Sequence, residues 1–144
     1  MKNPLIPLFL LLLIIGCGQE TLDLSSNTYF GVKEVLTSMN CEANCGETAD
    51  CEGVTIRVKG RLDDANINAF AHQFYLLDES QEKFTLEVKV DEAVSADVFQ
   101  KLNDMGGEVF LVKGEMEGYD ASTNFRCTRQ FLLRVDEASD VEME

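Results

Sequence analysis

The sequence has a single histidine, His72, and lacks the short motifs that mark common catalytic sites. It contains no Gly-x-Ser-x-Gly, no His-Glu-x-x-His and no glycine-rich phosphate-binding loop. One imidazole without a second histidine or a neighbouring nucleophile is weak support for acid–base or covalent catalysis. The many carboxylates are scattered over expected turns and outer faces. We therefore expect a protein that is not an enzyme and has no cofactor.

Basic residues are also scarce, since 12 lysines and arginines stand against 26 aspartates and glutamates, giving a formal net charge of −14. The imbalance belongs mostly to the two ends. Residues 18–52 hold seven acids and one base, and residues 136–144 hold five acids and no base. Between them, residues 53–135 hold fourteen acids and ten bases. Nucleic-acid affinity is built on lysine and arginine, so this composition argues against a nucleic-acid partner.

Long apolar runs are absent except for residues 5–15, which follow a start that carries Lys2. This run is shorter than the roughly 20 residues that a membrane-spanning helix needs, so it is typical of an export signal. It closes with the sequence Ile-Ile-Gly-Cys at residues 14–17, which resembles the lipobox of bacterial lipoproteins. The resemblance implies cleavage after Gly16, a diacylglycerol on Cys17, and an acyl chain such as palmitate on the new amine. The alternative is an ordinary secretory signal with a chance cysteine.

The lipobox implies a lipoprotein of the bacterial cell envelope, held to a membrane by its N-terminal lipid. Gly18 after the modified cysteine favours the outer membrane facing the periplasm. The expected partners are an envelope protein, a lipid or a cell-wall polymer, and the oligomeric state stays open. The expected organisation is a signal peptide (1–16), a lipidated flexible tether (17–27), an N-terminal helix with a cysteine-rich loop (28–52), a folded barrel (53–135) and an acidic tail (136–144).

Four further cysteines, an even number in an exported domain, indicate two disulfides: Cys41, Cys45, Cys51 and Cys127. Three pairings are possible. We favour Cys127 joined to one member of the N-terminal cluster, with the other two closing a short local loop. The alternative is a four-thiolate zinc site, although the spacings do not match the usual close Cys-x-x-Cys pairs. We expect disulfides and no metal.

Periodicity predicts both helices and strands. Val32, Val35, Leu36 and Met39 share one helical face, which predicts an N-terminal helix. Alternating apolar and polar residues predict strands over 54–62 and 84–90, and shorter or less regular patterns predict strands over 74–77, 109–116 and 125–135. Between the third and fourth strands, a short helix is predicted from a cap at Ser95 to the glycines 106–107.

Three strands, a helix and two strands, with Gly60 and Gly114 inside the first and fourth strands, resemble the OB-fold. The phrases Val-Lys-Gly-Arg (58–61) and Val-Lys-Gly-Glu (112–115) look like the matching strands of anticodon-binding-like OB domains, including exported bacterial relatives. The expected fold class is therefore mainly β: a five-stranded OB-fold Greek-key barrel with a short helix between strands 3 and 4 and an N-terminal helix. A β-sandwich is the alternative.

The OB-fold resemblance implies a ligand on the outer face of the second and third strands, rimmed by the loops 63–72 and 118–124. The ligand-face candidates are Tyr75, Lys89 and Tyr119. Grooves that bind single-stranded nucleic acid combine basic residues with several stacked aromatics, and this face lacks that combination. For Tyr75, the alternative is an ordinary half-buried strand tyrosine.

A second candidate surface is basic and comprises Arg57, Lys59 and Arg61 from the first strand with Arg126 and Arg134 from the last. Lys113 joins them in some registers. These strands adjoin in an OB barrel, so the bases predict a patch for an anionic partner. The alternative is that the acidic ends, or neighbours such as Glu115 and Glu117, neutralise the patch. The sequence thus predicts a lipid-anchored, non-catalytic binding module of the cell envelope; the alternative is an exported OB-fold domain that binds single-stranded nucleic acid.

Overall fold

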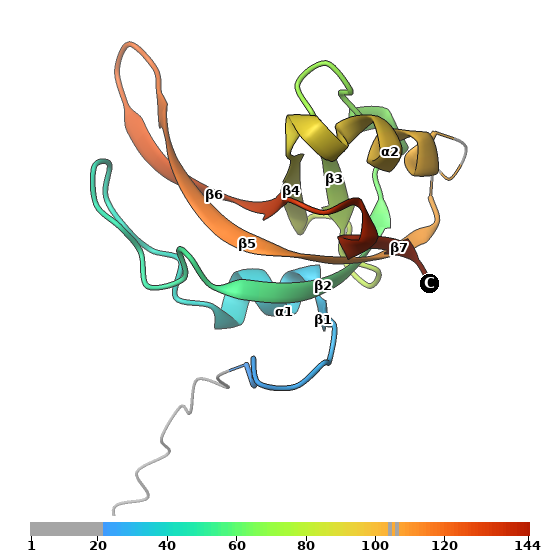
Figure 1. Ribbon diagram of the computed structural model, residues 1–144. Coiled ribbons are helices and arrows are strands. Elements are labelled where there is room, and N and C mark those ends of the chain that lie inside the picture. The colour runs from blue at the N-terminus through green and yellow to red at the C-terminus, as the bar shows by residue number, and fades with distance from the viewer. Residues whose placement is uncertain (1–21, 104, 106) are drawn as a thin grey trace, which may run out of the picture.

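The structure, a computed structural model, describes residues 22–103, 105 and 107–144 (Figure 1). The predicted signal peptide, the lipobox with Cys17 and the first part of the tether lie outside these residues. Of the helices in the described part, none is long and apolar enough to cross a membrane.

The described part of the chain is mainly β, with one seven-stranded sheet and two α-helices, whose arrangement Figure 1 shows. In chain order the elements are β1 (Phe30–Gly31), α1 (Val32–Ser38), β2 (Thr55–Leu62), β3 (Gln73–Leu77), β4 (Thr85–Val90), α2 (Glu92–Leu102), β5 (Val109–Ser122), β6 (Cys127–Val135) and β7 (Val141–Met143). Short 3₁₀ turns cover Asp64–Asn66 and Ala138–Asp140.

Five strands pair in a closed circuit. β2 pairs with β3, β3 with β4, β4 with β6, β6 with β5, and β5 again with β2. The β4–β6 pairing is parallel and the other four are antiparallel. In the chain, α2 connects β4 to β5.

The prediction of five strands is wrong in number, because β1 pairs with β2 and β7 pairs with β5. These strands contain two and three residues. A segment that short has no visible alternation, so periodicity cannot reveal it.

Alternation along the strands builds the core. In β2, every second residue from Ile56 to Leu62 is buried while its neighbours are partly exposed. β3, β4 and the first half of β5 follow the same rule. The largest fully buried side chains come from both helices and from β2 to β6: Val32, Val35, Ile56, Val58, Leu62, Phe74, Leu76, Leu86, Leu102, Phe110, Met116 and Leu133. The predicted period-two pattern therefore identified the inward faces correctly.

Two strand glycines allow close approach of neighbouring elements. A Cβ on Gly114 of β5 would lie 2.4 Å from the carbonyl oxygen of Arg134 on β6. A Cβ on Gly60 of β2 would lie 2.9 Å from Cγ2 of Val32, the first residue of α1. Side chains at either position would therefore push β6 or α1 away from its neighbour.

A buried carboxylate joins α1 to the turn after β3. Asp78 is 6% exposed and accepts hydrogen bonds from the backbone N–H groups of Lys33, Ser80 and Gln81, and from the Ser80 hydroxyl. Burial acts to raise the pKa of Asp78, but these hydrogen bonds outweigh burial and the pKa is lowered. Asp78 is therefore a charged anchor between the helix and the β3–β4 hairpin.

Two predicted boundaries are corrected. The cap of α2 is Asp91, which accepts from the Ala93 N–H at 2.8 Å, whereas Ser95 is buried inside the helix. The loop predicted over 118–124 is mostly strand, because β5 pairs with β6 up to Ser122 opposite Cys127. Gly118, the first residue of that predicted loop, lies within this ladder opposite Phe131.

Candidate functional site: the outer face of β3, β4, β6 and β5

The predicted ligand face of β3 and β4 continues onto β6 and β5. Tyr75 lies opposite Glu87, Glu87 beside Leu132, and Leu132 opposite Glu117, which makes one row across the four strands. A second row, two residues along each strand, comprises Gln73, Lys89, Arg134 and Glu115. We call these two rows, together with Tyr119 and Gln130, the outer face.

Tyr119 spans this face. Its hydroxyl donates to Glu87 Oε2 at 2.9 Å and lies 2.7 Å from Gln130 Oε1. Since β6 separates β5 from β4, the Tyr119 side chain reaches across β6, where Leu132 is only 5% exposed. Burial, followed by the hydrogen bond to the Glu87 carboxylate, raises the pKa of Tyr119 to about 12. Tyr119 is thus a fixed part of the surface with a strongly held proton.

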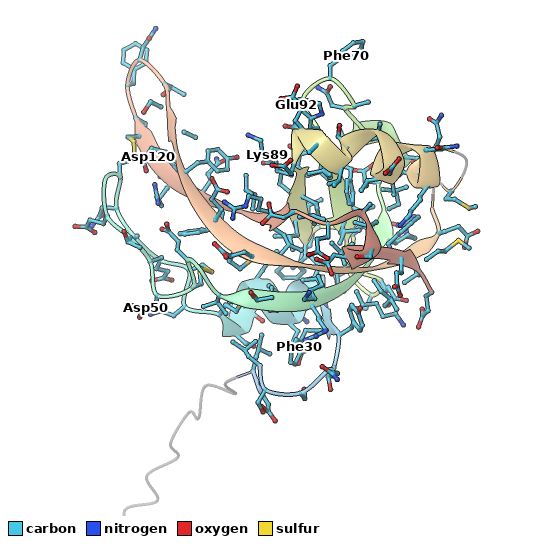
Figure 2. All side chains as sticks on the ribbon, viewed as in Figure 1. Phe30, Asp50, Phe70, Lys89, Glu92 and Asp120 are labelled. Atoms are coloured by element: carbon cyan, nitrogen blue, oxygen red, sulfur yellow. A yellow bond between two sulfur atoms is a disulfide. The ribbon has the colours of Figure 1, made fainter. Side chains whose placement is uncertain are left out.

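The structure brings the three ligand-face candidates together around Glu87. Burial and then the Glu87 carboxylate raise the pKa of Tyr75, as they do for Tyr119. Lys89 is the next outward residue on β4 and is exposed (Figure 2). Among the described residues, no carboxylate forms an ion pair with Lys89. The face therefore offers two aromatic rings, one acid and one available cation.

The single histidine is at the edge of this face. His72 precedes β3 with a left-handed backbone, φ 55°, and its carbonyl accepts from the Val90 N–H at 2.8 Å. Its Nδ1 atom is buried and has no hydrogen-bond partner in the part of the chain that the structure describes. His72 is therefore a turn residue that connects the start of β3 to the end of β4.

The predicted basic patch is distributed over paired charges. Lys59 lies 2.8 Å from Glu144 and 3.4 Å from Glu79, and Arg61 forms an ion pair with Glu82. Arg134 is surrounded by three carboxylates, and Lys113 has one: Glu115, Glu117 and Asp136 for Arg134, and Asp140 for Lys113. For these four basic side chains, the alternative that neighbouring acids neutralise the patch therefore holds.

Two members of the patch differ from the rest. Arg57 lies directly opposite Lys113 in the β2–β5 ladder, and Arg126 is exposed in the turn between β5 and β6, apart from the others. Neither forms an ion pair with another described residue. Like charges opposite each other in a sheet are unfavourable, so the contact of Lys113 with Asp140, at 3.2 Å, relieves this pair.

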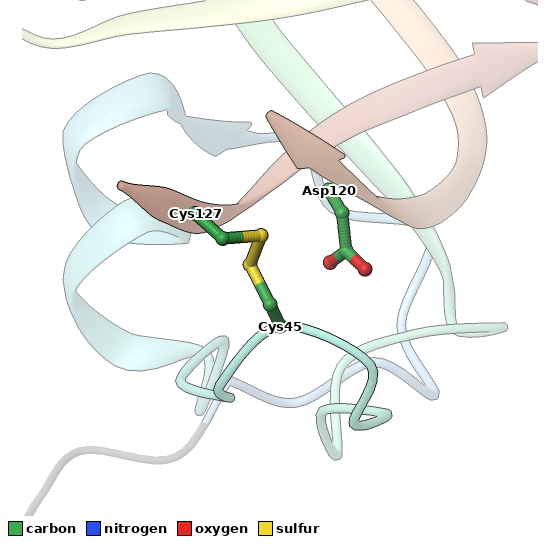
Figure 3. A group of neighbouring side chains, drawn as sticks. All are labelled: Cys45, Asp120 and Cys127. Atoms are coloured by element: carbon green, nitrogen blue, oxygen red, sulfur yellow. A yellow bond between two sulfur atoms is a disulfide. The ribbon is translucent and has the colours of Figure 1, made fainter. Parts of the chain in front are cut away.

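The four cysteines form two disulfides, Cys41–Cys51 and Cys45–Cys127. This confirms the favoured pairing, in which Cys127 joins the N-terminal cluster and the other two close a local loop. Asp120 lies beside the Cys45–Cys127 bridge (Figure 3), with its carboxylate and the two sulfurs within 4.8 Å of one another. A four-thiolate zinc site needs four free cysteine thiolates, whereas in this structure all four sulfurs are paired in disulfides, so the disulfide interpretation applies and the four-thiolate alternative does not.

Sequence reasoning missed Arg129, which fastens the cysteine-rich loop to the β5–β6 hairpin. Its guanidinium contacts both carboxylate oxygens of Glu52, at 2.7 and 2.8 Å, and Asp120 at 3.0 Å. The Gly46 N–H also donates to Asp120 at 3.0 Å. The hydrogen bonds from Arg129, and then from the Ala49 N–H, lower the pKa of Glu52.

The alternation of β6 contains the signal for this contact. Arg129 lies on the same face of β6 as Phe131 and Leu133, whose side chains face the interior. A charged residue at an inward position needs a partner, because isolated charges are costly to bury. The identity of the partner, 77 residues earlier in the chain, is not visible in the local pattern.

Comparison with protein-family models finds no match for this chain, and comparison with curated protein sequences finds none either. Its function must therefore be argued from the residues and geometry described above.

Proposed function

We propose that this protein is a lipid-anchored, non-catalytic binding module of the bacterial cell envelope, built on an OB-fold barrel. The observation that carries the proposal is the outer face itself. Tyr119 donates a hydrogen bond to the Glu87 carboxylate, Tyr75 lies opposite Glu87 in the β3–β4 ladder, and the available Lys89 is the next outward residue on β4. Small-molecule sites commonly combine aromatic surface with a few fixed polar groups, and this face has that composition.

The strand circuit supports the OB-fold part of the proposal. An OB-fold is a five-stranded Greek-key barrel, and here five strands pair in a circuit with one parallel pairing. The helix α2 lies between the third and fourth strands of that circuit, as the resemblance implies. On this interpretation, β1 and β7 are additions to the barrel that extend β2 and β5 at their edges.

The arrangement of the chain supports an anchored module. In Figure 1 the described chain enters at the bottom, whereas the loop between β2 and β3 and the β5–β6 hairpin project at the top. A lipid on Cys17 would then hold the molecule by the end opposite these loops. Two disulfides are typical of exported proteins and rare in reducing compartments, which agrees with the lipobox.

The charges favour this function over the nucleic-acid alternative. Glu87 and Glu117 stand in the same row as Tyr75, and Arg134 is already surrounded by carboxylates. A nucleic-acid site would need free lysines and arginines along the aromatic rings. A salt-sensitive mobility shift of labelled single-stranded DNA by the purified protein would instead establish the alternative.

Anchoring is tested by labelling with an alkyne analogue of palmitate in bacteria that express the full chain. The wild type should carry the label and sediment with membranes, whereas Cys17→Ser should lose the label and appear in the soluble fraction. Gly18→Ala is the matched control, because it changes the adjacent residue and keeps the cysteine. An unlabelled wild type, or a Cys17→Ser variant that keeps the label, would contradict the proposed anchor.

Ligand binding is tested by titrating the isotope-labelled protein with isolated envelope components and following its amide NMR signals. The components are glycans, phospholipid vesicles and acidic polymers. We expect at least one to shift the signals of Tyr75, Lys89 and Tyr119. If none of the components perturbs the outer face, the proposed function is wrong.

A further inference from the structure

A hollow of about 520 Å³ lies between the loop that follows β2 and the outer face at β3 and β4. We call it the loop pocket. Its polar lining comprises Asp63, Asn66, Asn68, Gln73, Tyr75 and Thr85. We infer that the loop pocket binds a ring of an uncharged saccharide, an inference that rests on the ligand-binding function proposed above. Its volume is within the range of about 300–1,000 Å³ common for small-molecule sites.

The charge of the lining excludes an anionic ligand. No lysine or arginine is among the described residues that line the loop pocket, and Asp63 is its one acid. The Asp63 carboxylate already accepts from the Ala65 N–H at 3.1 Å and from Asn66 Nδ2 at 2.7 Å. A phosphate or carboxylate group would therefore find no counter-charge and would lie beside a fixed negative charge.

The remaining polar groups match hydroxyls. Within the described chain, Asn68 Nδ2, Gln73 Oε1 and Thr85 Oγ1 have no hydrogen-bond partner, although the other side-chain atoms of Asn68 and Gln73 do. This set contains an amide donor, an amide acceptor and a hydroxyl. A sugar hydroxyl donates one hydrogen bond and accepts two, so a saccharide can satisfy donors and acceptors together.

The same pocket also has apolar surface for the ring of a sugar. The side chains of Ile67 and Tyr75 line it beside the amides. One face of a pyranose ring presents mainly C–H groups, which pack on an aromatic or aliphatic side chain. A ligand that combines a C–H face with hydroxyl edges therefore fits this lining better than a purely polar or purely apolar molecule does.

The loop that forms the pocket is fixed before a ligand arrives. Asn68 and Gln73 exchange two backbone hydrogen bonds, of 2.8 and 3.0 Å, and Asn68 Oδ1 accepts from the Ala71 N–H at 3.0 Å. Asp63 caps the 3₁₀ turn at the other end of the loop. A binding site held in place in this way loses less entropy on binding.

Beyond the pocket, the tip of the same loop exposes Phe70, whose side chain is 98% accessible and projects away from the molecule (Figure 2). A glycan longer than one ring has further C–H faces that can reach this side chain. Phe125, 99% exposed on the β5–β6 hairpin, is a matched control, because it has the same exposure on a different loop.

The test titrates two neutral tetrasaccharides, maltotetraose and the tetramer of N-acetylglucosamine, into the protein purified from bacterial membranes. The detergent must have no sugar headgroup. We expect saturable shifts of the amide signals of residues 63–68, Gln73, Tyr75 and Thr85. If only the N-acetylated tetramer binds, the source is a cell-wall type of glycan; if both bind, the pocket recognises neutral hexoses in general.

Two substitutions establish the contacts. Thr85→Val removes one exposed hydroxyl and should weaken binding about 3- to 10-fold. Thr55→Val is the control, because Thr55 is also exposed at the start of a strand but lies outside the loop pocket. The Thr55→Val variant should bind the saccharide with unchanged affinity. Phe70→Ala should weaken binding of a tetrasaccharide, whereas Phe125→Ala should not.

Failure of this inference is distinguishable from failure of the proposed function. If neither tetrasaccharide shifts the pocket signals, or if Thr85→Val binds as Thr55→Val does, the saccharide inference is wrong. If, in that case, another envelope component shifts Tyr75, Lys89 and Tyr119, the binding function stands with a different ligand class. If no component shifts them, both are wrong.

Discussion

Removing the Cys45–Cys127 disulfide should destabilise the protein more than any other change to the cysteine-rich loop. The bridge joins residues 82 positions apart, whereas Cys41–Cys51 joins residues 10 positions apart. A disulfide acts largely by restricting the unfolded chain, and its effect grows with the loop that it closes. Loop-closure entropy gives about 4.5 kcal/mol for the long loop and about 2.7 kcal/mol for the short one at 25 °C.

The two disulfides differ less in the burial of their cysteines than in the length of the loop that each one closes. Cys127 is exposed and Cys45 half-buried, so replacing both by serine removes little packing. Cys51 is 3% exposed, and losing its burial adds about 1 kcal/mol to the cost of removing the short bridge. The double variant Cys45→Ser/Cys127→Ser should therefore still lose about 1 kcal/mol more than Cys41→Ala/Cys51→Ala.

The assay is urea unfolding followed by far-ultraviolet circular dichroism, since the sequence has no tryptophan to report by fluorescence. The free energy of unfolding in water is obtained by linear extrapolation. The long-loop variant should also show a larger denaturant slope, because its unfolded chain is less compact. Its folded spectrum should be unchanged, since Arg129, Glu52 and Asp120 still hold the loop on the hairpin.

Two results would refute this reasoning. One is a loss below about 1 kcal/mol for the long-loop variant with an unchanged slope, which would mean that the bridge does not restrict the unfolded chain. The other is a larger loss for the short-loop variant, which would mean that packing around Cys51 outweighs loop entropy.

Three further predictions concern the fold and the outer face. Gly114→Ala should cost about 3 kcal/mol in urea unfolding, because its Cβ would lie 2.4 Å from the Arg134 carbonyl oxygen; an unchanged midpoint would show that β5 and β6 can separate freely. Asp78→Ala should cost about 3 kcal/mol in the same assay, because three backbone N–H groups lose a charged acceptor, while an effect near zero would mean that water replaces the carboxylate. Tyr119, whose pKa is raised from 10.0 to about 12, keeps its proton in the folded state after the unfolded state has lost it. The free energy of unfolding should therefore fall as pH rises from 10 to about 12, and Tyr119→Phe should reduce that fall; equal pH dependence in both proteins would contradict the assignment.

The sequence predicted the inward faces of the long strands well, because each long strand carries its own evidence. Ile56, Val58 and Leu62 alternate with polar residues, and the structure buries all three. The same reasoning could not find β1 and β7, whose two and three residues pair with the stretches of β2 and β5 that β3 and β6 leave unpaired. Such strands are created by the tertiary structure and leave no periodic trace.

Pairing across the sheet determined what could be predicted about the candidate site. Tyr75 and Lys89 were placed on one face by alternation within β3 and β4. Tyr119 was expected in a loop, but it belongs to β5 and reaches Glu87 over β6. That contact depends on the β5–β6 register and the parallel β4–β6 pairing, and neither can be deduced from the sequence of one strand.

The acidic C-terminal segment changes which surface is available for a ligand. In the segment predicted as an acidic tail, Asp140 contacts Lys113 at 3.2 Å and Glu144 contacts Lys59 at 2.8 Å. These acids neutralise the outward bases of β2 and β5, so that surface attracts an anionic partner less strongly than its sequence implies. Lys89, on the opposite side of the strand circuit, has no such partner in the described chain. Of the two bases on the outer face, Arg134 is therefore paired with carboxylates, whereas Lys89 is the unpaired one among the described residues and lies on the β3–β4 side with Tyr75.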